Sequence, residues 1–411
     1  MQQNHIAAQG SDQTAFSILT RQICVDGWRA DKAALIGVLC RRTAAQRAAI
    51  RRAYAFLYRE PLLNCFRYKL SRHCLLSVDF WKAMILWTMD PAERDANLVH
   101  EAVKKKDESY VSVLVEVSCA STPDHLMAVR KIYRKLFSSS VEEDVASSPA
   151  LQEPLKKVRE IMRGNVESSV QALVSFAACR IDMFRMFRLQ KGLCSCTTPT
   201  LQMLLRLVSS YRYAGEHVDM DVAKLEAAQL SEAIIEKRLH GDEVARIIST
   251  RSKPQLRATF QQYKDDQGTD VVEDIGSSHC GGGGGKQLAG MLRSAVLCLT
   301  SPEKHFAEVI RHSILGLGTY EDMLTRVIVS RAEVDMEQIK EEYRARYGSA
   351  VSVDVAGDTS FGYRDMLLTL LRGQELYYTT NERKLHVIKR KNYSENSDCI
   401  TLREMKLHVI K

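Results

Sequence analysis

The stretch RSKPQLRATFQQY, residues 251–263, recurs in related form at three other places in the chain. The aligned segments are RTAAQRAAIRRAY at 42–54, STPDHLMAVRKIY at 121–133 and RAEVDMEQIKEEY at 331–343, all without gaps and all ending in tyrosine. A short apolar run precedes each of the four: LIGVL, VSVLVEV, VARII or LTRVIV. Because the apolar spacing is helical, each repeat is predicted to contain one helix, a tight turn and a second helix. No series of strands and hairpins is predicted, and the fold class is therefore all-α.

The residues at these turns favour helix starts. The stretches TAAQ at 43–46 and SKPQ at 252–255 match the capping box. In this motif a hydroxyl accepts from the N–H three residues on, and the glutamine reaches back to the N–H of the capping residue. Pro123 and Pro254 fall in the first helical turn, where a missing N–H has no cost.

The spacing of the four segments locates an insertion. The second interval between their tyrosines is about 50 residues longer than the other two, and removing a segment near 158–202 restores the period. This segment is apolar and basic, which predicts either an amphipathic helix lying on a membrane or a partner, or an extra loop without function. A tail from residue 374 carries KLHVIK twice, and it predicts either contact with acidic lipid or a solvated segment.

The composition of the 411 residues narrows the function. The chain has no apolar run of about 18 residues and no basic start, so neither a membrane span nor a secretory signal is predicted. The eleven cysteines include no C-x2-C pair, which disfavours a zinc site or a disulfide framework and predicts a reduced, cytoplasmic protein. The net charge is +8, and most of the excess lies in 158–202 and 374–411, so no nucleic-acid partner is predicted.

A candidate metal site lies near the C-terminal end of the repeats. The stretch ILGLGT at 314–319 precedes the helix-forming YEDMLTRVIV, and Asp358 follows forty residues after Gly318. Two glycines two residues apart permit a sharp turn with carbonyl oxygens pointing outward. The carbonyls of Ile314, Gly316 and Gly318, together with the Asp358 carboxylate, offer the oxygen ligands that calcium prefers. The alternative is that GLGT only starts a helix capped by its threonine.

Five stretches carry a resemblance to a known family: ILWTMDPAERDANLVHEA (85–102), LVSSYRYAGE (207–216), TRSKPQLRATFQQYK (250–264), GLGTYEDMLTRVIVSRAEVDMEQIKEEYRARYG (316–348) and GDTSFGYRDMLLTLL (357–371). With these stretches the chain resembles the annexins, and in particular the plant annexins. The resemblance implies a curved, all-helical disc of four repeats with about five helices each, which binds acidic phospholipid through calcium. It also implies that the loop carbonyls and Asp358 hold the ion while lipid phosphate completes the shell.

The implied repeats are residues 15–90, 91–215 with the insertion, 216–302 and 303–373, followed by the basic tail 374–411. Repeat 1 reads Gly27-Trp28-Arg29-Ala30 where the family has G-x-G-T, and Lys69 stands where repeat 4 has Asp358. Both changes oppose cation binding, while Trp28 either contacts lipid or packs in the fold. The corresponding loops of repeats 2 and 3, KKKDESYV and KRLHGDEV, also lack the pattern. Repeat 4 alone is therefore predicted to bind calcium.

Three other motifs predict no chemistry. The run from Cys280 to Lys286 lacks the first glycine and the hydroxyl of a phosphate-binding loop, and it is predicted to be a flexible loop between helices. The histidine linked to peroxidase activity in some plant annexins is absent from residues 40–42, which read Cys-Arg-Arg. Cys119 and Cys298 match a family pair proposed to be redox-active, but their apolar surroundings predict buried, inert side chains.

These observations predict a cytoplasmic protein that performs no reaction and docks peripherally on the plasma membrane or other acidic membranes when calcium rises. The family resemblance adds a role in stress response. One alternative is a calcium-independent helical scaffold that binds membrane or cytoskeleton through its basic segments, in which case salt would weaken binding and chelator would not. A second alternative is a redox or peroxidase-type enzyme that depends on Cys119 and Cys298.

Overall fold

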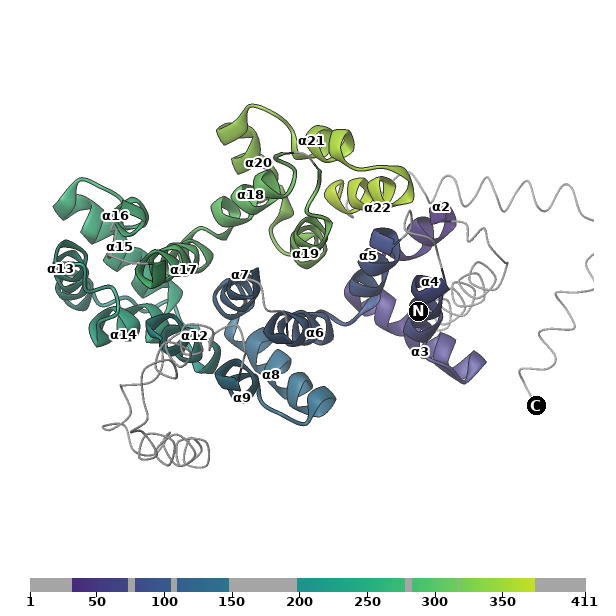
Figure 1. Cartoon of the computed structure of the whole chain (residues 1–411), viewed down its shortest axis with the longest axis horizontal. Coiled ribbons are helices and arrows are strands. Elements are labelled where there is room, and N and C mark those ends of the chain that lie inside the picture. Colours follow the sequence, from purple (N-terminus) through teal and green to yellow (C-terminus); the bar gives the residue numbers. More distant parts are fainter. Residues whose placement is uncertain are drawn as a thin grey trace, which may run out of the picture. The chain divides into compact units, whose positions relative to one another are not determined.

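The computed structural model describes residues 32–72, 78–104, 109–147, 198–277, 283–316 and 318–373, and within these ranges all regular structure is helical (Figure 1). The all-α prediction is confirmed. The chain divides into two compact units, which are described separately below. Unit 1 comprises Met1–Asp90 and Val309–Lys411, and unit 2 comprises Pro91–Glu308. Among the described helices, none is both long enough and apolar enough to cross a bilayer.

The four aligned segments all form the predicted helices, and their bounds are α3 Ala44–Tyr58, α8 Pro123–Phe137, α15 Lys253–Gln267 and α20 Met336–Tyr347. Each apolar run before them lies in a helix of its own, namely α2 Lys32–Leu35 with η1 Ile36–Cys40, α7 Ser109–Val115 with η3 Glu116–Ala120, α14 Asp242–Thr250, and α19 Glu321–Arg331. The elements η1 and η3 are π-helical, which the apolar pattern did not predict. The four terminal tyrosines are fully or almost fully buried, which explains why this residue marks the repeat.

One of the two predicted capping boxes is complete. The Thr43 hydroxyl accepts from the backbone N–H of Gln46, whose side chain accepts from the backbone N–H of Thr43. At the start of α15 the box is only half formed, and the prediction there was wrong. The Ser252 hydroxyl accepts from the Gln255 N–H, but the Gln255 amide instead bonds the backbone N–H and C=O of Asp219, both at 2.8 Å. The glutamine therefore joins two helices rather than closing its own turn.

The described residues of unit 2 form two sets of helices, one that includes α7, η3 and α8 and one that includes α14 and α15. The first set adds α6 Pro91–Lys104, α9 Val141–Ser147 and α12 Pro199–Ser209, and the second adds α13 Met220–Ile235, α16 Val271–Ser277 and α17 Gly283–Thr300. The last helix of each set packs on the partner set, because α17 contacts α7 and η3 while α12 contacts α14 and α17. Residues 199–202, at the edge of the predicted insertion, form the first turn of α12, and residues 148–197 lie outside the described part of the chain.

The glycine run before α17 differs from its prediction as a loop. Gly283 to Lys286 form the first turn of α17, so this part of the run is helical. The apolar residues that follow, including Leu288 and Leu292, are buried in the core, and their packing outweighs the low helix propensity of glycine.

Unit 1 is built in the same way. It contains α2, η1, α3, α4 Leu62–Arg72 and α5 Val78–Thr88 from the first part of the chain, and α19, α20, α21 Val351–Asp358 and α22 Phe361–Leu371 from the last part. Here α5 contacts α19 and α22, and α22 contacts η1, so the last helix of each repeat again packs on its partner. Trp81 and Trp87 on α5 are almost completely buried in this core.

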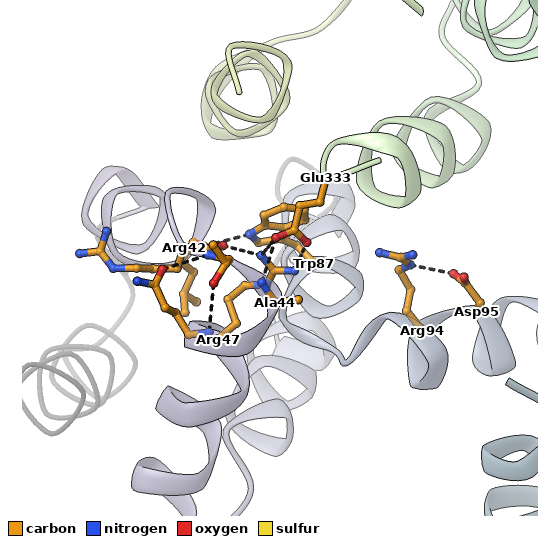
Figure 2. A network of polar contacts seen from close by, with 10 residues as sticks. Arg42, Ala44, Arg47, Trp87, Arg94, Asp95 and Glu333 are labelled. Atoms are coloured by element: carbon orange, nitrogen blue, oxygen red, sulfur yellow. Dashed lines mark hydrogen bonds and ion pairs between the residues drawn. The ribbon is translucent and has the colours of Figure 1, made fainter. Parts of the chain in front are cut away.

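A buried ion pair fastens the two halves of unit 1 (Figure 2). The Arg47 guanidinium on α3 donates to both carboxylate oxygens of Glu333, from the turn between α19 and α20, at 3.2 and 2.7 Å. Glu333 also accepts from the backbone N–H of Ala44 at 2.8 Å, which satisfies a free donor at the start of α3. The Arg47 guanidinium also lies over the Trp87 ring, 3.7 Å from the ring centroid, in a cation–π contact.

Candidate calcium site

The candidate loop joins α18 Pro302–Ser313 to α19, and its shape depends on two glycines. Gly316 and Gly318 have φ angles of 121° and 108°, a region that residues with a Cβ rarely adopt. A Cβ added to either residue would meet nothing within 4 Å, so glycine is needed for backbone conformation and not for space. The loop is closed at its base by a 2.8 Å hydrogen bond from the Tyr320 N–H to the Ser313 carbonyl.

The Thr319 hydroxyl connects this loop to Asp358. It lies 2.6 Å from a carboxylate oxygen of Asp358 and 2.8 Å from the carbonyl oxygen of the same residue. Thr319 therefore does not cap α19, whose capping position is Tyr320 and carries no side-chain cap bond. The simple alternative of a threonine-capped helix was wrong, because the hydroxyl is used across the repeat. These contacts connect the two segments that carry the residues predicted from sequence, the loop with Ile314, Gly316 and Gly318 and the end of α21 with Asp358.

A second polar cluster holds α21 in place. The Asp354 carboxylate, one turn before Asp358, accepts from Arg311 at 3.1 Å, from the Tyr343 hydroxyl at 2.7 Å and from the Ser349 hydroxyl at 2.6 Å. Partial burial alone raises the pKa of Asp354, but the hydrogen bonds from Ser349 and Tyr343 and the charge of Arg311 outweigh this effect and lower it. Because Arg311 stands at the end of α18, the cluster fixes both elements that carry the candidate site.

This tyrosine–aspartate contact recurs, and sequence reasoning did not identify it. Tyr133 donates to Asp144 and Tyr263 donates to Asp274, each eleven residues further along the chain. In repeat 1 the corresponding residue after Tyr54 is Cys65, so the carboxylate is lost there. The constant spacing of a tyrosine and an aspartate was the signal that would have revealed it.

The donor set suits calcium. Within the described residues, no hydrogen bond ends on the carbonyl oxygens of Ile314, Gly316 or Gly318. The described residues contain no group of three or more His, Cys, Asp or Glu side chains that could hold a metal. A cation here would accordingly meet one carboxylate and several backbone carbonyls, the oxygen-rich mixture typical of calcium and poor for zinc.

The other repeats differ at the corresponding positions. Lys69, which replaces Asp358 in repeat 1, is buried on α4, while residues 27–30 lie outside the described part of the chain. In repeat 3, the repeat spacing matches Arg238 with Gly318, and the Arg238 guanidinium forms ion pairs with Glu232 and Glu236. A positively charged arginine side chain therefore stands in the repeat 3 loop where repeat 4 has a glycine. Residues 105–108 of the repeat 2 loop also lie outside the described part.

The two cysteines considered for redox chemistry are buried, as their apolar context predicts. Cys119 is 1% exposed and Cys298 is completely buried. Burial raises the pKa of the Cys119 thiol to about 11, despite the opposing charges of Arg212 and Lys253. At neutral pH the thiolate needed for reactivity is therefore scarce.

Comparison with known proteins identifies the family. The family model described as annexin matches residues 226–283 and 305–370. Annexin D3 from Arabidopsis thaliana is 38% identical over 356 residues, which cover 86% of this chain and 93% of that protein. Annexin-like protein RJ4 from Fragaria ananassa is 37% identical over 84% of this chain and 92% of its own length. The solved structure of annexin III aligns over 88% of this chain and 94% of its own, with a TM-score of 0.67 and 22% identity.

The helical repeats and the glycine loop define a protein of annexin repeats. The chain belongs to the annexin family, and its relatives include several plant annexins. Calcium-dependent binding of phospholipid is characteristic of this family, whose members are mainly non-enzymatic proteins that attach to membrane surfaces. A calcium-bound structure, that of annexin (Sm)1, shares the fold with a TM-score of 0.63 at 20% identity.

Proposed function

We propose that this annexin binds acidic phospholipid membranes through a calcium ion held by repeat 4. The protein ligands are the carbonyls of Ile314, Gly316 and Gly318 and the carboxylate of Asp358. When bound, calcium supplies a positive centre that protein oxygens and lipid phosphate share. The proposal includes the repeat boundaries predicted above, a cytoplasmic location and a role in stress response.

The contact of Thr319 with Asp358 is the observation that carries the proposal. The hydroxyl holds the carboxylate beside a loop that has two left-handed glycines and unused carbonyl oxygens. Among the described residues, Thr319 forms a hydrogen bond with only one carboxylate oxygen of Asp358. The second carboxylate oxygen is therefore available to bind calcium. The loop glycines are exposed, which leaves room for a lipid phosphate.

Co-sedimentation of the full chain with vesicles tests the proposal. The vesicles contain phosphatidylserine in phosphatidylcholine, and binding is measured in calcium and in chelator. We expect the native chain to pellet in calcium, and the Asp358→Ala variant to lose most of this pelleting because the only carboxylate ligand is gone. Asp365→Ala on α22 is the matched control, since this carboxylate is exposed and pairs only weakly with Arg364.

Two results would contradict the proposal. Equal pelleting in chelator, weakened by salt, would favour attachment through the basic segments 158–202 and 374–411, of which residues 158–197 and 374–411 lie outside the described part of the chain. Equal loss in the Asp358→Ala and Asp365→Ala variants would mean that general surface charge, and not the loop site, governs binding.

A further inference from the structure

Among the described residues around the candidate calcium site, three large apolar side chains are exposed. Leu315 and Tyr320 belong to the loop between α18 and α19 and are 47% and 64% exposed. Phe361 follows Asp358 by three residues, at the start of α22, and is 67% exposed. The Thr319–Asp358 contact ties the two segments that carry these side chains. We call Leu315, Tyr320 and Phe361 the apolar rim.

Phe361 is also held in an unfavourable backbone conformation. Its φ angle is 52°, in the left-handed region that a bulky residue rarely adopts. Glycine would adopt the same angle without strain, and the neighbouring residue at position 362 is already a glycine. The fold thus keeps a strained, exposed phenylalanine at a position where its own stability favours glycine. Strain of this kind collects at functional sites.

From this arrangement we infer that the apolar rim enters the interfacial layer of the bilayer, with Phe361 as the main contact. The inference rests on the proposed calcium site, because that site sets which surface faces the lipid headgroups. A calcium bridge to phosphate brings the loop to the headgroup level, and side chains beside it then reach the boundary with the acyl chains. Aromatic residues suit this zone, since the Tyr320 ring is apolar while its hydroxyl stays hydrated.

The apolar rim and the calcium site make different contributions to membrane binding. The carboxylate and carbonyl oxygens make binding depend on calcium, whereas the rim adds affinity that does not depend on charge. Salt screens the first contribution and has little effect on the second. Removing Phe361 should therefore weaken binding at every calcium concentration without changing the requirement for calcium.

The Phe361→Gly variant separates this role from a structural one. We expect its midpoint of thermal unfolding to rise, because the left-handed strain is relieved, and its apparent affinity for phosphatidylserine vesicles to fall on the order of tenfold. Val334→Gly is the matched control. Val334 is 64% exposed but lies beyond the far end of α19, a helix about 16 Å long. Its replacement should leave vesicle binding unchanged.

Depth of insertion is measured with a Phe361→Trp variant and vesicles whose acyl chains carry bromine. We expect bromine to quench more fluorescence in this variant than in the native chain, and only in calcium. Unchanged affinity of Phe361→Gly, or equal quenching of both chains, would overturn the role of the rim while leaving the calcium site intact. Calcium-independent pelleting of the native chain would instead remove the proposed function on which the inference rests.

Discussion

Replacing Glu333 by alanine should destabilise unit 1 and leave unit 2 unchanged. The substitution removes both hydrogen bonds to Arg47 and the acceptor for the Ala44 N–H. The Arg47 side chain is 1% exposed, so its charge stays buried after the carboxylate is lost, with the neutral Arg42 carbonyl still accepting from it. The stack on Trp87 is retained, but an aromatic face does not replace a carboxylate.

The expected loss in free energy of unfolding follows from this geometry. Removing one partner of a buried ion pair costs about 3–5 kcal/mol, mainly because the remaining charge is uncompensated. Since Glu333 is itself 24% exposed, water can reach part of the vacated position, and we expect a value of about 3 kcal/mol. The double variant Arg47→Met with Glu333→Ala should cost less than the sum of the two single variants, because no charge then remains buried.

Urea unfolding followed by two signals provides the assay. All three tryptophans, Trp28, Trp81 and Trp87, belong to unit 1, so fluorescence reports on that unit alone, whereas circular dichroism reports on both. In Glu333→Ala the fluorescence transition should move to lower urea, and the part of the dichroism transition that comes from unit 2 should not move. A separate transition for each signal is itself expected, because two compact units need not unfold as one.

The control is Glu337→Ala, which removes a surface pair with Lys340 and should cost less than about 1 kcal/mol. The reasoning is refuted if Glu333→Ala and Glu337→Ala shift the fluorescence transition equally. It is also refuted if the costs of Arg47→Met and Glu333→Ala simply add, because independent costs mean that the two side chains do not stabilise each other.

Two further predictions concern unit 2. Burial alone raises the pKa of Asp95, but the charge of Arg94 and the hydrogen bond with His125 outweigh burial and lower the pKa below 3.8. The ionised Asp95 carboxylate therefore stabilises the folded state fully above pH 3.8, and this contribution is lost as the pH falls through the lowered pKa. Urea unfolding measured by dichroism should show Asp95→Asn much less stable than the native chain at pH 6, with the gap closing towards pH 2; a constant gap would contradict this. Because Cys119 is buried with a raised pKa, alkylation at pH 8 followed by mass spectrometry should modify it only in denaturant, and rapid modification of the folded chain would show that its surroundings are open.

Much of the fold could be predicted from local patterns. The helices at 42–54, 121–133, 251–263 and 331–343 followed from helical apolar spacing and from capping residues, which act within a few positions. The prediction failed where a contact with a residue distant in sequence determined the local structure. Gln255 bonds Asp219 instead of its own turn, and the start of α17 is helical because its later residues are buried. Contacts of this kind cannot be predicted from the local sequence pattern.

In the candidate site, too, some features could be predicted from sequence and others depend on contacts between distant residues. Gly316, Gly318 and Asp358 could be singled out from residue type and spacing, because each has a chemical property that the loop requires. The role of Thr319 could not, since threonine before a helix ordinarily caps it, and only the structure brings Asp358 within reach of its hydroxyl. The exposure and strained backbone of Phe361 likewise depend on how α21 and α22 meet.

The division of the chain into units has a consequence for its synthesis. Unit 2 is continuous in sequence, whereas unit 1 is assembled from Met1–Asp90 and Val309–Lys411. At about 5–20 residues per second, a ribosome needs roughly 10–45 s to make the intervening segment, and during that time the first part of unit 1 lacks its partner helices. The newly made α5, with Trp81 and Trp87, is then without the surface of α19 and α22 that covers it in the finished protein. Chaperones that shield apolar surface should therefore engage the first ninety residues until translation is nearly complete.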